Sequence, residues 1–209
     1  KYPDVQMKFT QGWYTEMDPA FNLQGYNPRS FWPSWGPTAE AAKAVDPTHP
    51  DQIYHHYKRA YETGQQTRNT VTLTGGNDNA LLSSSISHFY HKGVLPNTDF
   101  TSYNARIGAQ FKISDKLRFN PTVIYTNSGG TRYNADRFNE SLTYWSPRHD
   151  VRDYITEQGT MKTYLNNNPI YGAYVNLFKD NVDRIIANAN IQYDPVSWLN
   201  VNYRLGMDY

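Results

Sequence analysis

Residues 103–113, Tyr-Asn-Ala-Arg-Ile-Gly-Ala-Gln-Phe-Lys-Ile, alternate strictly between two kinds of side chain and decide the fold. The odd positions are apolar: Tyr103, Ala105, Ile107, Ala109, Phe111 and Ile113. The even positions between them are polar or glycine. Successive side chains of a β-strand point to opposite faces of its sheet, so this stretch predicts a strand with one apolar and one polar face.

The same two-residue period recurs in five other segments, at residues 70–75, 81–90, 117–126, 184–193 and 199–209. A weaker pattern around residues 4–10 predicts a seventh strand. Pro121 lacks the N–H that a strand ladder requires, so a bulge or weak pairing is expected there. The sequence therefore predicts an all-β fold of six or seven strands.

The connections between these segments alternate in length. Short turns at residues 75–79, 114–116 and 194–197 alternate with longer connections at 91–101 and 128–183, and residues 11–68 precede the first strand. Bacterial outer-membrane barrels have short periplasmic turns, longer extracellular loops and membrane-crossing strands of about 9–11 residues. We therefore expect residues 1–209 to be part of a transmembrane antiparallel β-barrel, with 11–68 and 128–183 as long extracellular loops.

Composition is compatible with this class of protein. The mean hydropathy is −0.77 and no run of 18 apolar residues exists, yet strands that alternate apolar and polar residues keep average hydropathy low. Aromatic residues reach 15%, with 18 Tyr, and are expected in two girdles at the strand ends. The expected girdles are Tyr103, Tyr125 and Tyr209 at the long-loop end, and Phe111, Phe119, Tyr193 and Trp198 at the short-turn end.

The net charge of +1 excludes an extended basic surface for nucleic acid.

The two long loops carry the candidate ligand contacts. Short helices are expected at residues 39–45, after Thr38 as N-cap, and at 53–63, ended by Gly64. Tyr144, Trp145 and Arg148 lie in an aromatic-rich loop, and such side chains suit recognition of sugars or peptides. The alternative is that these three residues pack the loop against itself or against a partner protein.

Catalytic and metal-binding patterns are weak or absent in the sequence. His49, His55 and His56 lack the spacing of a shared metal site and are interpreted as surface histidines. Asn77-Asp78-Asn79 lacks the terminal glutamate of a calcium loop and is interpreted as a turn. No phosphate-binding, hydrolase or zinc-protease motif appears. We expect no enzyme activity, no cofactor and no metal.

Several short motifs, in a shared order and spacing, resemble the SusC-like TonB-dependent transporters. They are Ser34-Trp35-Gly36-Pro37, Tyr61 to Gly64, Asn69 to Asp78, Gly93 to Asp99, Asn168-Pro169-Ile170-Tyr171, Asp183-Arg184 and Trp198 to Tyr209. The resemblance implies a plugged barrel of about 22 strands in the outer membrane of a Gram-negative, Bacteroidetes-like bacterium. It implies import of oligosaccharides or oligopeptides, a SusD-like surface lipoprotein as a lid, and energy from TonB. The plug and the TonB-contacting segment of the family have no counterpart in these 209 residues.

Two other classes of protein remain open from the sequence. A soluble carbohydrate-binding β-sandwich would bury the apolar faces of its strands against each other. The other class is a barrel-resident enzyme or adhesin, which a hydrolysis assay on glycans or peptides would discriminate.

Overall fold

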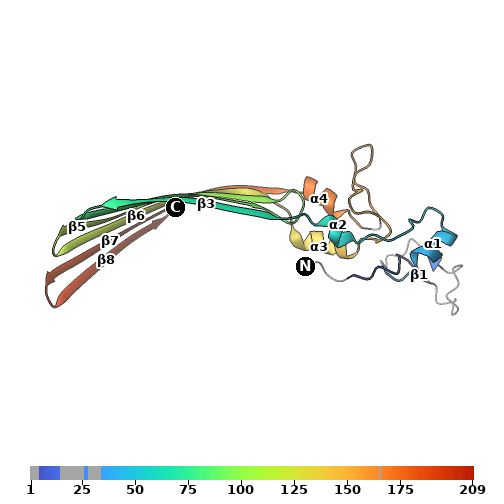
Figure 1. Ribbon diagram of the computed structural model, residues 1–209, viewed down its shortest axis with the longest axis horizontal. Coiled ribbons are helices and arrows are strands. Elements are labelled where there is room, and N and C mark those ends of the chain that lie inside the picture. The colour runs from blue at the N-terminus through green and yellow to red at the C-terminus, as the bar shows by residue number, and fades with distance from the viewer. Residues whose placement is uncertain (1–4, 15–25, 28–33, 165) are drawn as a thin grey trace. The chain divides into compact units, whose positions relative to one another are not determined.

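The computed structural model describes residues 5–14, 26–27, 34–164 and 166–209 (Figure 1). The chain divides into two compact units. The loop unit comprises Lys1–Thr63, Gly93–Thr98 and Arg132–Phe178, and the sheet unit comprises Gly64–Lys92, Asp99–Thr131 and Lys179–Tyr209. The chain therefore enters the sheet unit three times, and the segment before the first passage and the two segments between passages build the loop unit.

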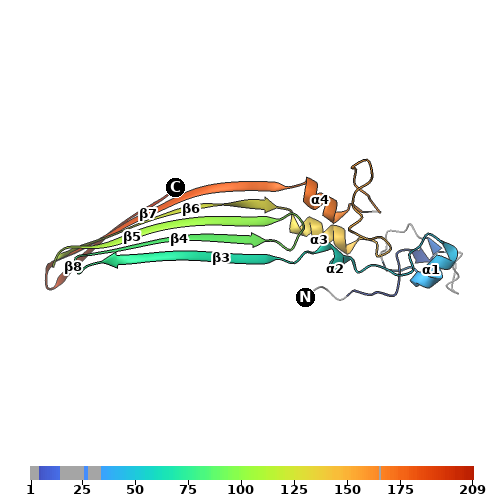
Figure 2. The ribbon, with the colours of Figure 1, turned by 45° about the horizontal axis from the view of Figure 1, so that its top comes forward.

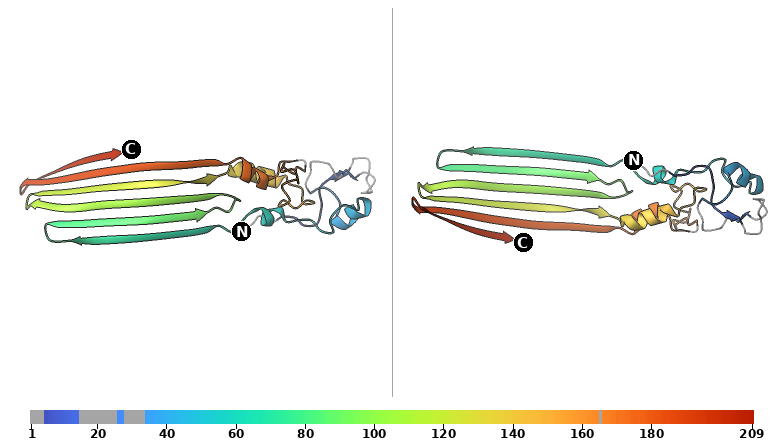
Figure 3. Two further views of the ribbon diagram at one scale, coloured as in Figure 1. Left: turned by 90° about the horizontal axis from the view of Figure 1, so that it is seen from above. Right: turned by 90° about the horizontal axis from the view of Figure 1, so that it is seen from below.

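The sheet unit is a six-stranded antiparallel meander in which each strand pairs with its neighbours in sequence (Figures 2 and 3). The strands are β3 (Gln65–Gly76), β4 (Ala80–Lys92), β5 (Asp99–Ser114), β6 (Leu117–Arg132), β7 (Phe178–Val196) and β8 (Leu199–Asp208). The sheet is open, with β3 and β8 at its edges. The expected antiparallel β architecture is confirmed, and these strands do not close into a barrel.

The strands are longer than predicted at the end that carries the longer connections. β3 begins at Gln65, β6 continues to Arg132 and β7 begins at Phe178, so the predicted loop bounds 11–68 and 128–183 are wrong. The connection predicted at 91–101 shrinks to residues 93–98. Hydrophobic alternation detects a strand only where one face is continuously apolar, and in these extensions apolar residues such as Phe178 and Val182 stand singly among polar ones.

The seventh strand predicted around residues 4–10 is not found at residues 5–10. Residue 4 lies outside the described residues. Residues 5–10 contain only a single bridge between Phe9 and Thr38. The pairing of β5 with β6 keeps the same register before and after Pro121. The register shift lies instead between Lys112 and Ser114, next to the turn, so no bulge is found at Pro121. The ladder pairs Gly108 with Thr122 and Phe111 with Phe119 and skips Asn120 and Pro121, which agrees with the weak pairing expected there.

The turn between β3 and β4 is held by a side chain. Asn77 Oδ1 accepts hydrogen bonds from the backbone N–H groups of Asn79 and Ala80, both at 3.0 Å, and Asn77 N donates to Ala80 O at 2.7 Å. This is a short asparagine turn, as predicted. Its residues have negative φ, and Asn97 in the next connection is the non-glycine residue with positive φ among the described residues.

The loop unit contains short helices and one small strand pair. The helices are α1 (Ala39–Val45), α2 (His56–Ala60), α3 (Ala135–Thr143) and α4 (Pro169–Val175), and β1 (Trp13–Tyr14) pairs with β2 (Tyr26–Asn27). α1 has the predicted bounds, and Thr38 Oγ1 accepts from Ala41 N at 3.3 Å as its N-cap. α2 is shorter than predicted because His55 caps its start and Tyr61 is already extended. No helix in the described ranges is both long enough and apolar enough to cross a membrane.

The core of the loop unit joins segments that are distant in sequence. Its buried members come from α2, α3, α4 and the residues between the last two: Ala60, Phe138, Leu142, Trp145, Val151, Ile170 and Ala173. Asn168 is buried and organises the start of α4. Its Oδ1 accepts from Ile170 N at 2.9 Å, its Nδ2 donates to Val151 O at 2.9 Å, and Pro169 occupies the first helical turn.

Candidate functional site

The registers of the sheet bring the apolar sides of all six strands onto one face. Directly opposed residues of an antiparallel pair point to the same face, so Val71 lies beside Ile86, Ile86 beside Ala105, and Ala105 beside Tyr125. The hydrogen bond from Tyr125 to Asp183 places the odd residues of β7 on this face too, and Ala189 pairs with Leu205 of β8.

We call this surface the apolar band. Its members are Val71 and Leu73 of β3; Ala80, Leu82 and Ile86 of β4; Tyr103, Ala105, Ile107, Ala109 and Phe111 of β5; Leu117, Phe119, Pro121, Val123 and Tyr125 of β6; Ile185, Ala187, Ala189, Ile191 and Tyr193 of β7; Val201, Tyr203, Leu205 and Met207 of β8; and Tyr209, which follows β8 and bonds through its backbone to Ile185. Ser84 is a polar residue that lies within the band.

The apolar band is exposed along its length. Ile86 is 68% exposed, Ile107 59% and Leu205 51%. Large contiguous apolar surfaces mark contact with another protein or with lipid. Along β5 to β8 the band spans nine consecutive positions, 103–111, 117–125, 185–193 and 201–209, within the range of about 9–11 residues that a tilted strand needs to cross a bilayer.

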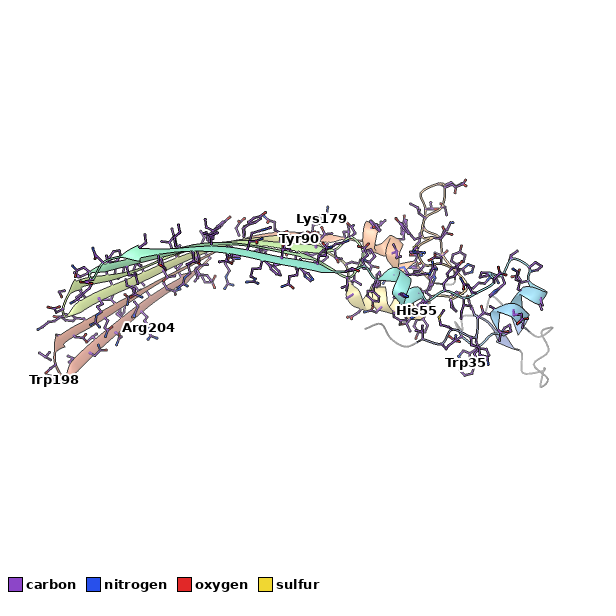
Figure 4. All side chains as sticks on the ribbon, in the orientation of Figure 1. Trp35, His55, Tyr90, Lys179, Trp198 and Arg204 are labelled. Atoms are coloured by element: carbon purple, nitrogen blue, oxygen red, sulfur yellow. The ribbon has the colours of Figure 1, made fainter. Side chains whose placement is uncertain are left out.

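The opposite face of the sheet is mainly polar. It carries Arg106, Arg118 and Arg204, and Arg184 forms a bidentate ion pair with Asp208 across β7 and β8. Some apolar side chains interrupt this face: Leu81, Phe89, Phe100, Ile124, Phe178, Val182 and Ile186. Trp198 and Arg204 are labelled in Figure 4, where Trp198 marks the short-turn end. An apolar face and a polar face on one sheet fit a surface with lipid on one side and water on the other.

A cationic aromatic cluster lies on the polar face, towards the end with the longer connections. The guanidinium of Arg68 lies over the Phe89 ring, 4.8 Å from its centroid, and the Phe89 and Phe100 centroids are 6.1 Å apart. This cluster was not predicted, because Arg68 precedes the strand expected at residues 70–75 and Phe89 lies out of register with the apolar residues near it.

The two predicted aromatic girdles differ in where their residues lie along the strands. At the short-turn end the Phe111 and Phe119 rings stack with centroids 6.3 Å apart, and Trp198 is 81% exposed in the turn. Tyr103 and Tyr125 lie inside β5 and β6 rather than at their ends, because both strands continue beyond them. These two tyrosines mark the border of the apolar band.

The structure separates the three predicted ligand residues by role. Tyr144 is 41% exposed, whereas Trp145 is fully buried in the loop core and donates from Nε1 to His149 O at 2.8 Å. Arg148 forms an ion pair with Asp46 at 2.5 Å and donates to Thr48 Oγ1 at 2.9 Å. Trp145 and Arg148 therefore hold the loop unit together, and ligand contact by the three stays a prediction for which Tyr144 offers the most exposed surface.

The interpretation of the histidine cluster as surface histidines is wrong for two of its members. His49 is buried, with Nε2 2.8 Å from Thr10 Oγ1 and Nδ1 2.8 Å from Pro50 O, so both ring nitrogens have partners. His56 is also buried, and burial lowers its pKa to about 4. Within the described residues, no three His, Cys, Asp or Glu side chains are grouped as a metal site would require.

Comparison with known proteins adds no assignment. No protein-family model matches the chain, and no curated protein matches it either.

Proposed function

We propose that this chain forms part of the wall of an outer-membrane β-barrel transporter of the SusC-like, TonB-dependent kind. The observation that carries the proposal is the exposed apolar band, which extends over six consecutive strands and ends at tyrosines. In this proposal the band contacts lipid and the polar face lines the interior of the barrel. Further strands from outside these residues complete the wall, because open sheet edges are not stable in lipid.

The transported molecules are oligosaccharides or oligopeptides in this proposal. The loop unit is extracellular and contacts the substrate, a SusD-like lipoprotein lid, or both. Energy is supplied by TonB through residues outside these 209. The protein binds and moves its substrate without breaking bonds, and the motif resemblance of the sequence supports this choice within the barrel class.

The β-sandwich alternative is less well supported. A sandwich needs a second sheet packed on the apolar face at about 10 Å. Among the described residues, the strands outside the six-stranded sheet form only a pair of two-residue strands, which is too small to be the second sheet. Ile107, Val201 and Leu205 would be core residues in a sandwich, and they are exposed here.

The first test is the environment of the protein. We expect the full protein that contains this chain to fractionate with the outer membrane, and the 209 residues alone to require detergent. A soluble, monomeric 209-residue chain that unfolds cooperatively in water would refute the proposal.

The second test is transport. Cells that lack the protein should lose uptake of one class of labelled oligosaccharide or oligopeptide, and disruption of TonB should cause the same loss. Unchanged uptake of both classes would refute the proposed transport function without refuting the assignment to a membrane barrel.

A further inference from the structure

Strands β4 to β7 are longer than the apolar band that they carry. β5 and β6 each have 16 residues and β7 has 19. A 16-residue strand is about 53 Å long at about 3.3 Å per residue, and it rises about 40 Å when tilted by about 40°. The apolar belt of a membrane barrel is only about 25 Å tall. One end of these strands must therefore extend beyond it.

The surplus lies at the end away from the short turns. Beyond Tyr103 and Tyr125, the face that carries the apolar band becomes polar on every strand that continues. We call these residues the polar collar: Gln65, Thr67 and Asn69 of β3; His88, Tyr90 and Lys92 of β4; Asp99 and Thr101 of β5; Asn127, Gly129 and Thr131 of β6; and Lys179, Asn181 and Asp183 of β7. Figure 4 labels Tyr90 and Lys179 at this end of the sheet.

The border between band and collar is built from rings with polar partners on the collar side. Tyr125 donates from its hydroxyl to Asp183 Oδ1 at 2.6 Å, and Asn127 Nδ2 donates to the same oxygen at 2.9 Å. The Tyr103 ring stacks on His88 with centroids 4.6 Å apart. An apolar ring body with a polar end is the arrangement that membrane interfaces favour.

The chemistry of the collar fits one neighbour. It is rich in amide and hydroxyl groups, and its two lysines are balanced by two aspartates, with Lys92 directly opposite Asp99. Such a surface forms hydrogen bonds with hydroxyl groups and has little net charge. It is unsuited to hydrocarbon, where each polar group without a partner costs several kcal/mol.

We propose that the polar collar lies outside the hydrocarbon, in the headgroup and saccharide layer of the outer leaflet, with the boundary at Tyr103 and Tyr125. This inference rests on the proposed function. It also places the cluster of Arg68, Phe89 and Phe100 above the membrane, on the inner side of the wall.

The test compares three sites on one strand. These 209 residues contain no cysteine, so each single substitution introduces one thiol into them. The substitutions are Ile107→Cys in the band, Thr101→Cys in the collar and Gln110→Cys on the polar face. The full protein is labelled with a fluorophore and reconstituted with lipids that carry quenchers either in the acyl chains or on the headgroups. We expect acyl-chain quenching at residue 107, headgroup quenching at residue 101, and little quenching of either kind at residue 110.

The outcomes separate this inference from the proposed function. Absence of acyl-chain quenching at residue 107 overturns the membrane proposal itself. Equal acyl-chain quenching at 107 and 101 overturns the collar and leaves the membrane proposal standing. Acyl-chain quenching at residue 107, together with neither acyl-chain nor headgroup quenching at residue 101, means that protein covers the collar. This result also overturns the inference.

Discussion

The hydroxyl of Tyr125 donates a 2.6 Å hydrogen bond to Oδ1 of Asp183, which joins β6 to β7 at the border between the apolar band and the polar collar. The same oxygen accepts a bond from Asn127. One carboxylate therefore links two side chains of a neighbouring strand at the level where the surface changes character.

Removal of the Tyr125 hydroxyl should weaken this border. We expect Tyr125→Phe to cause a small decrease in the denaturant midpoint of the full protein in detergent, because the ring remains and only the bond to Asp183 is lost. Tyr203→Phe is the matched control, since the Tyr203 hydroxyl has no hydrogen-bond partner among the described residues. Equal midpoints for the two variants would show that the Tyr125 bond contributes nothing.

A charge in the middle of the apolar band should impair membrane assembly. Ile107→Arg is expected to cost about 2–4 kcal/mol, the range measured for arginine on the lipid face near the bilayer midplane. Gln110→Arg places the same side chain on the polar face of the same strand and should be tolerated. Folding into lipid vesicles, followed by gel mobility, measures both, and similar yields for the two variants would contradict the assignment of the faces.

The neighbours Tyr144 and Trp145 should differ in how much each contributes to the stability of the loop unit. Trp145→Ala removes the largest fully buried side chain of the loop core and is expected to cost about 3–5 kcal/mol. Tyr144→Ala is expected to cost less than about 1 kcal/mol, because the side chain is largely at the surface. Hydrogen exchange of the α3 amides measures the difference.

Tyr144 also tests ligand contact. If this residue touches substrate, Tyr144→Ala lowers uptake while α3 keeps its exchange protection. Normal uptake by this variant would remove Tyr144 from the candidate ligand contacts.

The loop unit should lose stability in mild acid. Burial lowers the pKa of His56 and of His149 to about 4, and the charges of His55 and Arg148 add to the effect. Between pH 6.5 and 4 the unfolded chain therefore binds protons that the folded unit does not, so the free energy of unfolding falls as pH falls through this range. The slope is at most about 1.4 kcal/mol per pH unit for each histidine.

Exchange protection of α3 between pH 7 and 4, corrected for intrinsic rates, measures this effect. The double variant His56→Gln/His149→Gln should have a flatter profile, whatever its stability at pH 7. An unchanged slope in the double variant would exclude the two histidines as the cause of the pH dependence.

Asp46 provides an internal contrast. Its hydrogen bonds to Thr48 and Arg148 lower its pKa to about 2, so its contribution to stability is lost only below about pH 4.

Some elements followed directly from local rules. The alternation at residues 103–113 identified β5, and Thr38 before Ala39–Val45 identified α1 with its bounds. The extensions of β3, β6 and β7 were missed because the side of each strand that is apolar elsewhere is polar there, and isolated apolar residues such as Val182 do not make a two-residue hydrophobic period. Packing of the loop against itself was the stated alternative for Trp145, and its burial agrees with that alternative. The partners could not be named from the sequence, since the core residues come from α2, α3 and α4.

The sequence by itself determined which side of each strand is apolar, because a period of two fixes the face of every residue in a strand. Only the tertiary structure decided how far the strands run and where the band ends, because backbone hydrogen bonds between strands do not depend on side-chain polarity. It also decided that the segments before β3 and between β6 and β7 share one core. Arg148 reaches Asp46 across 102 residues of chain, and no local pattern encodes a contact over that separation.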